Sequence, residues 1–120
     1  MASILVIDDT PANLALAAKL LRAAGHVVIT AETARQGLAL AEDGLPDLIL
    51  MDLGLPDMDG TRTMNSLRTN PPTAQIRVVA FTAFAMSADR DRALADGFDG
   101  FLSKPIHVAS FANDVSELLG

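Results

Sequence analysis

A short apolar stretch bounded by two acids decides the fold, and it reads Asp47-Leu48-Ile49-Leu50-Met51-Asp52. A continuous apolar run of this length, followed by a loop that contains Gly54 and Pro56, is typical of a strand buried on both faces of a sheet. Four other short apolar runs predict further strands, at residues 3–7, 27–30, 77–81 and 98–102.

Longer amphipathic segments separate the expected strands. Residues 11–24 carry apolar side chains at helical spacing, which predicts a helix. Either Asp9 or Thr10 can cap that helix, and Gly25 stands where a C-terminal glycine belongs.

A second helix is expected at residues 33–42, closed by Gly44. Gly37 weakens this expectation, because glycine inside a helix costs about 1 kcal/mol relative to alanine. The other expected helices are one that carries Met64 and Leu67 and ends at Asn70, one at residues 87–96, and a last one with Val108, Phe111, Ala112, Val115 and Leu119 on one face.

Strands that alternate with helices imply right-handed crossovers and a parallel sheet covered on both faces. The sequence therefore predicts an α/β fold with a doubly wound, five-stranded parallel sheet. We find no internal repeat, linker or low-complexity tract, so residues 1–120 are expected to form one domain, a common domain length.

The composition excludes several classes of protein. The absence of cysteine rules out disulfide scaffolds, thiolate metal sites and cysteine nucleophiles. A net charge of −6 and only two lysines, Lys19 and Lys104, weigh against nucleic-acid binding. The chain shows no secretory-signal pattern and no apolar run near the roughly 18 residues of a membrane span. A cytoplasmic domain without a membrane segment is therefore expected.

Polar residues follow four of the expected strands: Asp8 and Asp9, Asp52, Thr82, and Lys104. In open parallel sheets, ligands bind beyond the carboxyl ends of the strands. Carboxylates in close quarters repel and need a cation, and carboxylate oxygens suit Mg²⁺. The lysine and the threonine hydroxyl suit phosphoryl oxygens. The pattern predicts a phosphoryl-transfer site, with Asp52 on the central strand as the candidate nucleophile.

Five short motifs in this order resemble the receiver domain of bacterial two-component response regulators across nearly the whole chain. They are Ile7-Asp8-Asp9, Leu50-Met51-Asp52-Leu53-Gly54-Leu55-Pro56, Met58-Asp59-Gly60, Phe81-Thr82-Ala83 and Ser103-Lys104-Pro105. The resemblance implies a flavodoxin-like, CheY-like sheet of strand order 2-1-3-4-5, an order that comes from the family and not from the residues. The sequence is similar both to single-domain cell-cycle regulators and to receivers of hybrid kinases.

The resemblance implies a role for each acid. Asp52 would accept a phosphoryl group from a phosphohistidine on a sensor histidine kinase or a histidine phosphotransfer protein. Mg²⁺ would be bound directly by Asp9, Asp52 and the main-chain carbonyl of Gly54, and by Asp8 largely through water. The chain would then act as a phosphorylation-activated signalling switch that contacts a downstream protein target. It would catalyse the transfer of the phosphoryl group to itself, but it would not be an enzyme that turns over a substrate.

The resemblance also implies a switch on the other side of the site. Lys104 would pair with the phosphoryl oxygens, Thr82 would move to hydrogen-bond one of them, and Phe101 would turn inward as Thr82 moves. The Lys104-Pro105 bond would be cis. Phe101 lacks the hydroxyl of the commoner tyrosine, so its inward rotamer is expected to be favoured more strongly.

Two positions bear on the lifetime of the phosphoryl group. Neither Gly54 nor Phe84 offers a polar side chain that could orient water. We expect Phe84 to restrict solvent and to slow self-hydrolysis.

Two alternatives remain open at this point. Asp57-Met58-Asp59-Gly60-Thr61 resembles the nucleophile motif of haloacid-dehalogenase-type phosphatases, but Pro56 separates it from the preceding strand. The other alternative is a receiver-shaped binding module that is never phosphorylated. Each site residue also has a plainer explanation when taken alone, as a helix cap, a turn residue or a surface cation.

Overall fold

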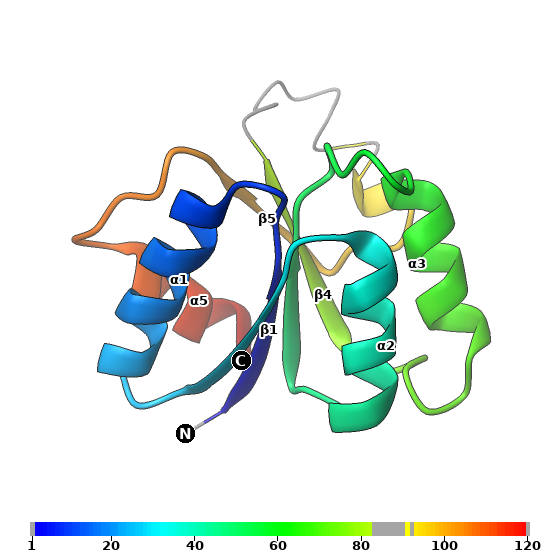
Figure 1. Ribbon diagram of the computed structural model, residues 1–120, viewed down its shortest axis with the longest axis horizontal. Helices are drawn as coiled ribbons and strands as arrows, with labels where there is room; N and C mark the ends of the chain where they lie inside the picture. The colour runs from blue at the N-terminus through cyan, green and yellow to red at the C-terminus, as the bar shows by residue number, and fades with distance from the viewer. Residues whose placement is uncertain (1, 83–90, 92, 120) are drawn as a thin grey trace.

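The computed structural model describes residues 2–82, 91 and 93–119, and it contains one five-stranded parallel sheet flanked by helices (Figure 1). The strand order β2-β1-β3-β4-β5 confirms the predicted fold class and order. The elements are β1 (Ser3–Ile7), α1 (Pro11–Ala23), β2 (Val27–Ala31), α2 (Ala34–Gly44), β3 (Leu48–Met51), α3 (Gly60–Thr69), β4 (Arg77–Thr82), β5 (Gly100–Ser103) and α5 (Phe111–Leu119).

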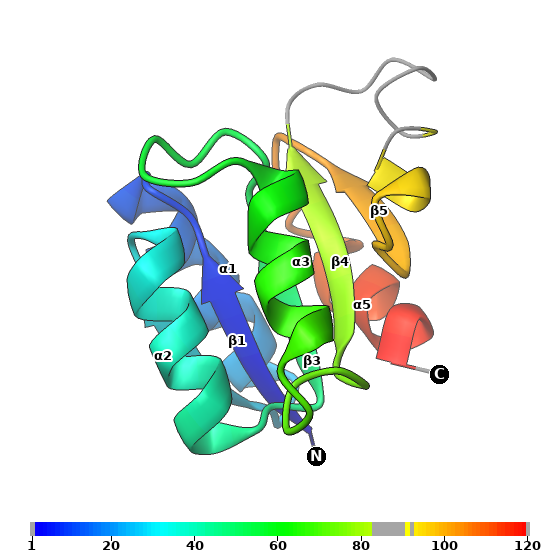
Figure 2. The ribbon, with the colours of Figure 1, turned by 90° about the vertical axis from the view of Figure 1, so that its right-hand side faces the viewer.

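The helices form two layers, one on each face of the sheet. Helices α1 and α5 cover one face, while α2 and α3 lie next to each other on the other (Figures 1 and 2). All four residues of β3 are buried, and alternate residues of this strand enter the two hydrophobic clusters on opposite faces. Burial on both faces explains why β3 is a continuous apolar run instead of an alternating pattern.

The strand register places the carboxyl ends of neighbouring strands side by side. Ile7 of β1 pairs with Met51 of β3, and Thr82 of β4 pairs with Ser103 of β5. The residue that follows each of these strands therefore emerges at the same edge of the sheet.

Two helix ends differ from the sequence expectation. No side-chain cap is found on α1 in the described structure: Thr10 occupies the cap position, and its N–H is donated to Asp8 Oδ1 instead. Gly44 does not close α2 but belongs to it, and Leu45 ends the helix in a left-handed conformation with φ of 44°. The Leu45 N–H still bonds the carbonyl of Ala41, which carries the helical pattern one residue further.

The last third of the chain also differs. Phe98 was expected to begin the fifth strand, but β5 begins at Gly100, and Phe98 is a buried core residue beyond the turn at Gly97. Val108 was expected on the apolar face of the last helix, but it is 62% exposed and precedes α5. A turn bonded to the His107 carbonyl directs the chain into α5, so the helix begins only at residue 111. The helix expected at 87–96 lies largely outside the described residues.

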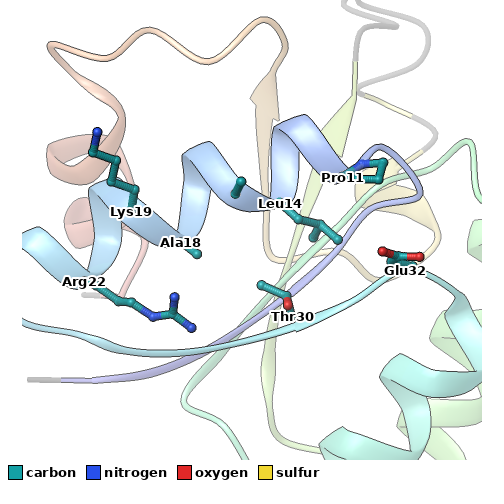
Figure 3. Close-up of a pocket in the computed structure, with 8 residues that line it drawn as sticks. Pro11, Leu14, Ala18, Lys19, Arg22, Thr30 and Glu32 are labelled. Carbon is teal, nitrogen blue, oxygen red and sulfur yellow. The ribbon is translucent and has the colours of Figure 1, made fainter.

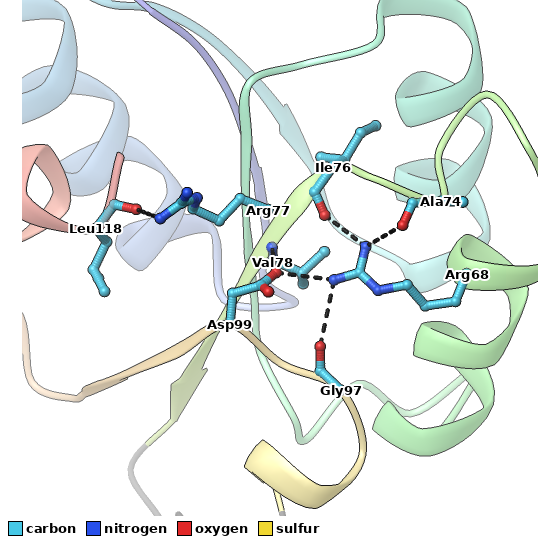
Figure 4. Close-up of polar contacts among 8 residues, drawn as sticks. All are labelled: Arg68, Ala74, Ile76, Arg77, Val78, Gly97, Asp99 and Leu118. Atoms are coloured by element: carbon cyan, nitrogen blue, oxygen red, sulfur yellow. Dashed lines mark hydrogen bonds and ion pairs between the residues drawn. The ribbon is translucent and has the colours of Figure 1, made fainter. Parts of the chain in front are cut away.

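Arg68 at the end of α3 holds the amino ends of β4 and β5 together (Figure 4). Its guanidinium donates to the carbonyls of Ala74 and Ile76, just before β4, and to the carbonyl of Gly97. It also forms an ion pair of 2.9 Å with Asp99, the residue before β5. This cluster lies at the end of the sheet opposite the acids that follow β1 and β3.

Gly37 has a packing role that explains a helix-weakening residue in α2. A Cβ atom at this position would lie 2.3 Å from Ile7 Cδ1 and 2.8 Å from Ile7 Cγ1. The absence of a side chain at Gly37 therefore lets α2 pack closely against β1 at Ile7, the residue that precedes Asp8.

Replacing Gly37 by alanine is expected to lower the free energy of unfolding by about 1–2 kcal/mol. Overpacking of a core costs about 1–3 kcal/mol, which exceeds the gain in helix propensity of about 1 kcal/mol. Gly44→Ala is the matched control in the same helix, because a Cβ there meets no atom within 4 Å. Alanine at 44 should stabilise by about 0.5–1 kcal/mol. Urea denaturation followed by circular dichroism measures the free energy of unfolding of both variants. If the two substitutions changed it in the same direction, the packing role of Gly37 would be contradicted.

Candidate functional site

Three carboxylates gather where β1 and β3 end. Asp8 and Asp9 follow β1, Asp52 follows β3, and one oxygen of each lies within 4.8 Å of the others. The ladder fixes this placement, because Asp8 N donates to the Ala31 carbonyl and Asp52 N donates to the Ile7 carbonyl. Asp8 is fully buried and Asp52 is 8% exposed, whereas Asp9 is exposed.

Lys104, which follows β5, extends its ammonium group into this cluster. The Nζ atom lies 2.6 Å from Asp8 Oδ2 and 3.1 Å from Asp52 Oδ2. It also lies 5.2 Å from the centre of the Phe81 ring, a cation–π distance. The Lys104 N–H bonds the Thr82 carbonyl, which continues the pairing of β4 with β5 past the end of β5. The peptide bond between Lys104 and Pro105 is cis, as the resemblance implied.

The cluster stabilises the charged form of Lys104. Partial burial alone would lower the pKa of the ammonium group, but its close contacts with the carboxyl groups of Asp8 and Asp52 outweigh burial and raise the pKa above 10.5. Lys104 is therefore a cation at any physiological pH.

The donor set fits a hard divalent cation. Three acidic side chains face one ammonium group, so the acids outnumber the cations at this site. Asp8 Oδ2 is held by charge attraction to Lys104, but among the described residues no donor reaches it along a hydrogen-bonding direction. A buried oxygen in this state, with two other carboxylates beside it, suits Mg²⁺, which prefers carboxylate oxygens.

The loop after β3 fixes one oxygen of Asp52. Gly54 donates its N–H to Asp52 Oδ1 at 2.9 Å, which leaves Oδ2 to the ammonium group. The role of the Gly54 carbonyl as a metal ligand stays a prediction.

The two expected switch residues lie on adjacent strands. Thr82 is the last residue of β4 and is buried, while Phe101 of β5 is half-buried against the cluster beneath α2 and α3. Their movements on phosphorylation, and the inward preference of Phe101, stay predictions. Phe84, expected to restrict solvent, lies outside the described residues.

The acids of the phosphatase-like motif are helix caps. Both oxygens of Asp57 accept N–H groups at the start of α2, from Ala34 and Arg35, each at 3.0 Å. Asp59 caps α3 by accepting the N–H of Arg62 at 2.7 Å. Neither carboxylate belongs to the cluster of Asp8, Asp9 and Asp52.

Sequence reasoning missed two features of this region. Phe81 was predicted only as part of a strand and of a receiver motif, yet its ring also lies beneath the Lys104 ammonium group. Asp57 was considered only as part of the phosphatase-like motif. No spacing in the sequence predicts either contact, because both join residues more than 20 positions apart.

A separate groove lies between α1 and β2 (Figure 3). It is lined by Leu14 and by three charged residues, Lys19, Arg22 and Glu32. Arg22 donates to the Val28 carbonyl at 2.9 Å, which satisfies one backbone group on the edge strand β2. The three clustered aspartates do not line this groove, so it is distinct from the acidic site.

Comparison with known proteins agrees with this fold. A model of the response regulator receiver domain matches residues 4–116. The polar-differentiation response regulator DivK of Brucella ovis is 35% identical over 118 residues, covering 98% of this chain and 96% of that protein. The chain therefore belongs to the response regulator receiver domain family, the phosphorylation-activated switches of two-component signalling.

Solved structures place the chain among CheY-like receivers. The chemotaxis response regulator CheY4 of Vibrio cholerae superposes with a TM-score of 0.91 at 24% identity over 98% of each chain, which shows the fold. The receiver domain of the sensor histidine kinase PA1611 from Pseudomonas aeruginosa PAO1 superposes with a TM-score of 0.87 at 29% identity, over 99% of this chain and 98% of that one. That structure has a magnesium ion coordinated in its active site cleft.

The family assignment identifies the chain as a signalling domain. Receiver domains interact with histidine kinases and with downstream targets. The comparisons give no support to the phosphatase or to the non-phosphorylated binding module. Within the described part of the chain, no helix is long and apolar enough to cross a membrane.

Asp57→Ala is expected to lower the free energy of unfolding at pH 7 by about 1 kcal/mol, the usual effect of losing a cap. Burial opposes the charged form, but the N–H groups of Ala34 and Arg35, together with the Arg35 charge, outweigh it and hold the pKa of Asp57 below 3.8. The contribution of Asp57 is therefore complete above pH 3.8 and is lost as the pH falls through the lowered pKa.

Urea denaturation at several pH values measures this difference between the variant and the unaltered chain. Asp43→Ala is the control, because that exposed carboxylate makes no hydrogen bond or ion pair in the described structure. If the difference in the free energy of unfolding between Asp57→Ala and the unaltered chain persisted unchanged well below pH 3.8, the capping role would be contradicted.

Proposed function

We propose that Asp52 is the phosphoacceptor of a receiver domain that spans residues 1–120. Its donor is a phosphohistidine on a sensor histidine kinase or a histidine phosphotransfer protein. The observation that carries the proposal is the position of the Asp52 carboxylate. It lies beside two other acids, with one oxygen fixed by Gly54 and the other 3.1 Å from Lys104, and it remains slightly exposed.

The transfer forms one bond and breaks one. A carboxylate oxygen of Asp52 bonds to phosphorus while the phosphorus–nitrogen bond of the phosphohistidine breaks. The bonding electron pair leaves with the imidazole nitrogen, which takes up a proton. The product is an acyl phosphate on Asp52.

The acidic residues and Lys104 prepare the site for this step. Asp8, Asp9 and Asp52, with the Gly54 carbonyl, would bind Mg²⁺, which when bound offsets charge on the phosphoryl oxygens. Lys104 stands where its ammonium group can leave the Asp52 oxygen and pair with the incoming phosphoryl group. The chain thereby assists its own phosphotransfer, and slow loss of the phosphoryl group to water resets it.

The phosphoryl group changes the contacts available to β4 and β5. Thr82 supplies a hydroxyl beside the site, and Phe101 is half-buried on the neighbouring strand. We infer that these two residues carry the change to a surface that a downstream protein binds, because only contacts that differ between two states can shift their populations. The signal leaves by protein–protein contact in the cytoplasm.

Asp52→Asn is expected to abolish Mg²⁺-dependent labelling by acetyl phosphate, because an amide cannot form the acyl phosphate. Labelling is measured by gel retardation of the phosphoprotein. Asp43→Asn, on the exposed side of α2, is the control and should label as the unaltered chain does. Undiminished labelling of Asp52→Asn would refute the assignment.

Lys104→Met is expected to make the thermal stability depend more strongly on Mg²⁺. The ammonium group now contacts two of the oxygens proposed to bind the cation, so its removal leaves Asp8 and Asp52 uncompensated and frees them for Mg²⁺. Thermal unfolding with and without millimolar Mg²⁺ measures the effect. Lys19→Met, in the groove beside α1, should behave as the unaltered chain. If Mg²⁺ shifted the melting temperature equally in the unaltered chain, Lys104→Met and Lys19→Met, this would count against a site that Lys104 and Mg²⁺ share.

A further inference from the structure

We propose that Asp57 is a positioning residue for the Mg²⁺ site. Its carboxylate ties the loop of residues 53–59 to the amino end of α2, and this tie holds the Gly54 main chain in place relative to Asp8 and Asp9. The inference rests on the proposed function, in which the acidic cluster binds Mg²⁺.

The first observation is the geometry of the Asp57 contact. Oδ1 accepts the N–H of Ala34 and Oδ2 accepts the N–H of Arg35, both at 3.0 Å. Two parallel bonds fix the orientation of a carboxylate as well as its position. The partners lie 22 and 23 residues away in the sequence, so the contact joins two separate segments.

The second observation is that α2 is itself fixed against β1. Gly37 has no side chain, and Ile7 fills the space that a Cβ would occupy. Ile7 is followed directly by Asp8, whose N–H bonds the carbonyl of Ala31, the last residue of β2. The start of α2 is therefore placed rigidly relative to the first two acids of the site.

The third observation concerns the other anchors of the loop. Gly54 bonds Asp52 Oδ1, Leu55 is buried, and Asp59 caps α3. These contacts hold the two ends of the loop. Within the described residues, Asp57 makes the side-chain hydrogen bonds that join the loop to α2.

These contacts connect Asp8 and Asp9, which follow β1, to the loop that follows Asp52. Without Asp57 the loop would be held only near its ends, and the Gly54 carbonyl would sample more positions. Mg²⁺ affinity would fall, because outer contacts that orient a ligand typically change metal affinity by about 10–100-fold. The phosphotransfer rate at saturating Mg²⁺ would change little, because the contact of Asp52 with Lys104 does not involve the loop.

Asp57→Ala and Asp57→Asn test the inference, with Thr33→Ala as the matched control. Thr33 is the other cap of α2, since its hydroxyl accepts the N–H of Gln36, but among the described residues it makes no hydrogen bond to the loop. The Mg²⁺ dissociation constant is measured by calorimetry, and the rate of labelling by acetyl phosphate is measured across Mg²⁺ concentrations.

We expect Asp57→Ala to raise the dissociation constant about tenfold, with a maximal labelling rate close to that of the unaltered chain. Asp57→Asn should lie between, because its amide offers one acceptor where the carboxylate offers two. Thr33→Ala should lower the melting temperature but bind Mg²⁺ normally.

Two results would overturn the inference while leaving the proposed function in place. One is normal Mg²⁺ binding by Asp57→Ala. The other is equal weakening by Thr33→Ala, which would show that a frayed helix is sufficient. Failure of the unaltered chain to bind Mg²⁺ or to be labelled would instead overturn the proposed function, and this inference with it.

Discussion

The pairing of β1 with β3 is the constraint on which the site depends. The register sets Ile7 opposite Met51, so the next residue of each strand brings a carboxylate to the same edge of the sheet. Asp8 and Asp52 are both buried there, and like charges at this distance repel. Lys104 offsets part of that repulsion and retains its own charge in doing so. The fold thus maintains a local excess of negative charge that a divalent cation can neutralise.

Two sets of contacts hold this charge excess in place, and they differ in character. On the side of α2, the close approach of Gly37 to Ile7 and the two bonds of Asp57 join rigid elements. On the side of β5, Lys104 is held by ion pairs and by the face of Phe81. Ion pairs and cation–π contacts can be exchanged for a phosphoryl group, whereas packed backbone cannot. The structure therefore fixes the half of the site that is proposed to bind the metal, and it holds the other half only by contacts that can be exchanged.

The sequence alone predicts the parts of this arrangement that follow from local pattern. Buried parallel strands are continuous apolar runs, and the rule that sites lie at strand carboxyl ends is enough to select Asp8, Asp52 and Lys104. Contacts between distant segments are not encoded in any local pattern, so the roles of Gly37 and Asp57 appear only in the structure. Gly37 is instructive, because the feature that weakens a helix prediction is the one that lets α2 pack. Val108 shows the converse error. Its helical spacing with Phe111 and Val115 extends the apolar pattern of the last helix toward the N-terminus, but residue 108 lies in the turn that follows His107 and is exposed.

Asp52, among all the acids of the chain, is the residue proposed to receive the phosphoryl group. Chemical trapping tests this assignment most directly: the protein is labelled with acetyl phosphate and Mg²⁺, reduced with borohydride, digested and analysed by mass spectrometry. Borohydride converts an aspartyl phosphate to homoserine, so we expect homoserine at position 52 and unaltered aspartate at Asp8, Asp9 and Asp57. Homoserine at Asp57, or at any acid outside the cluster while Asp52 stays intact, would contradict the assignment.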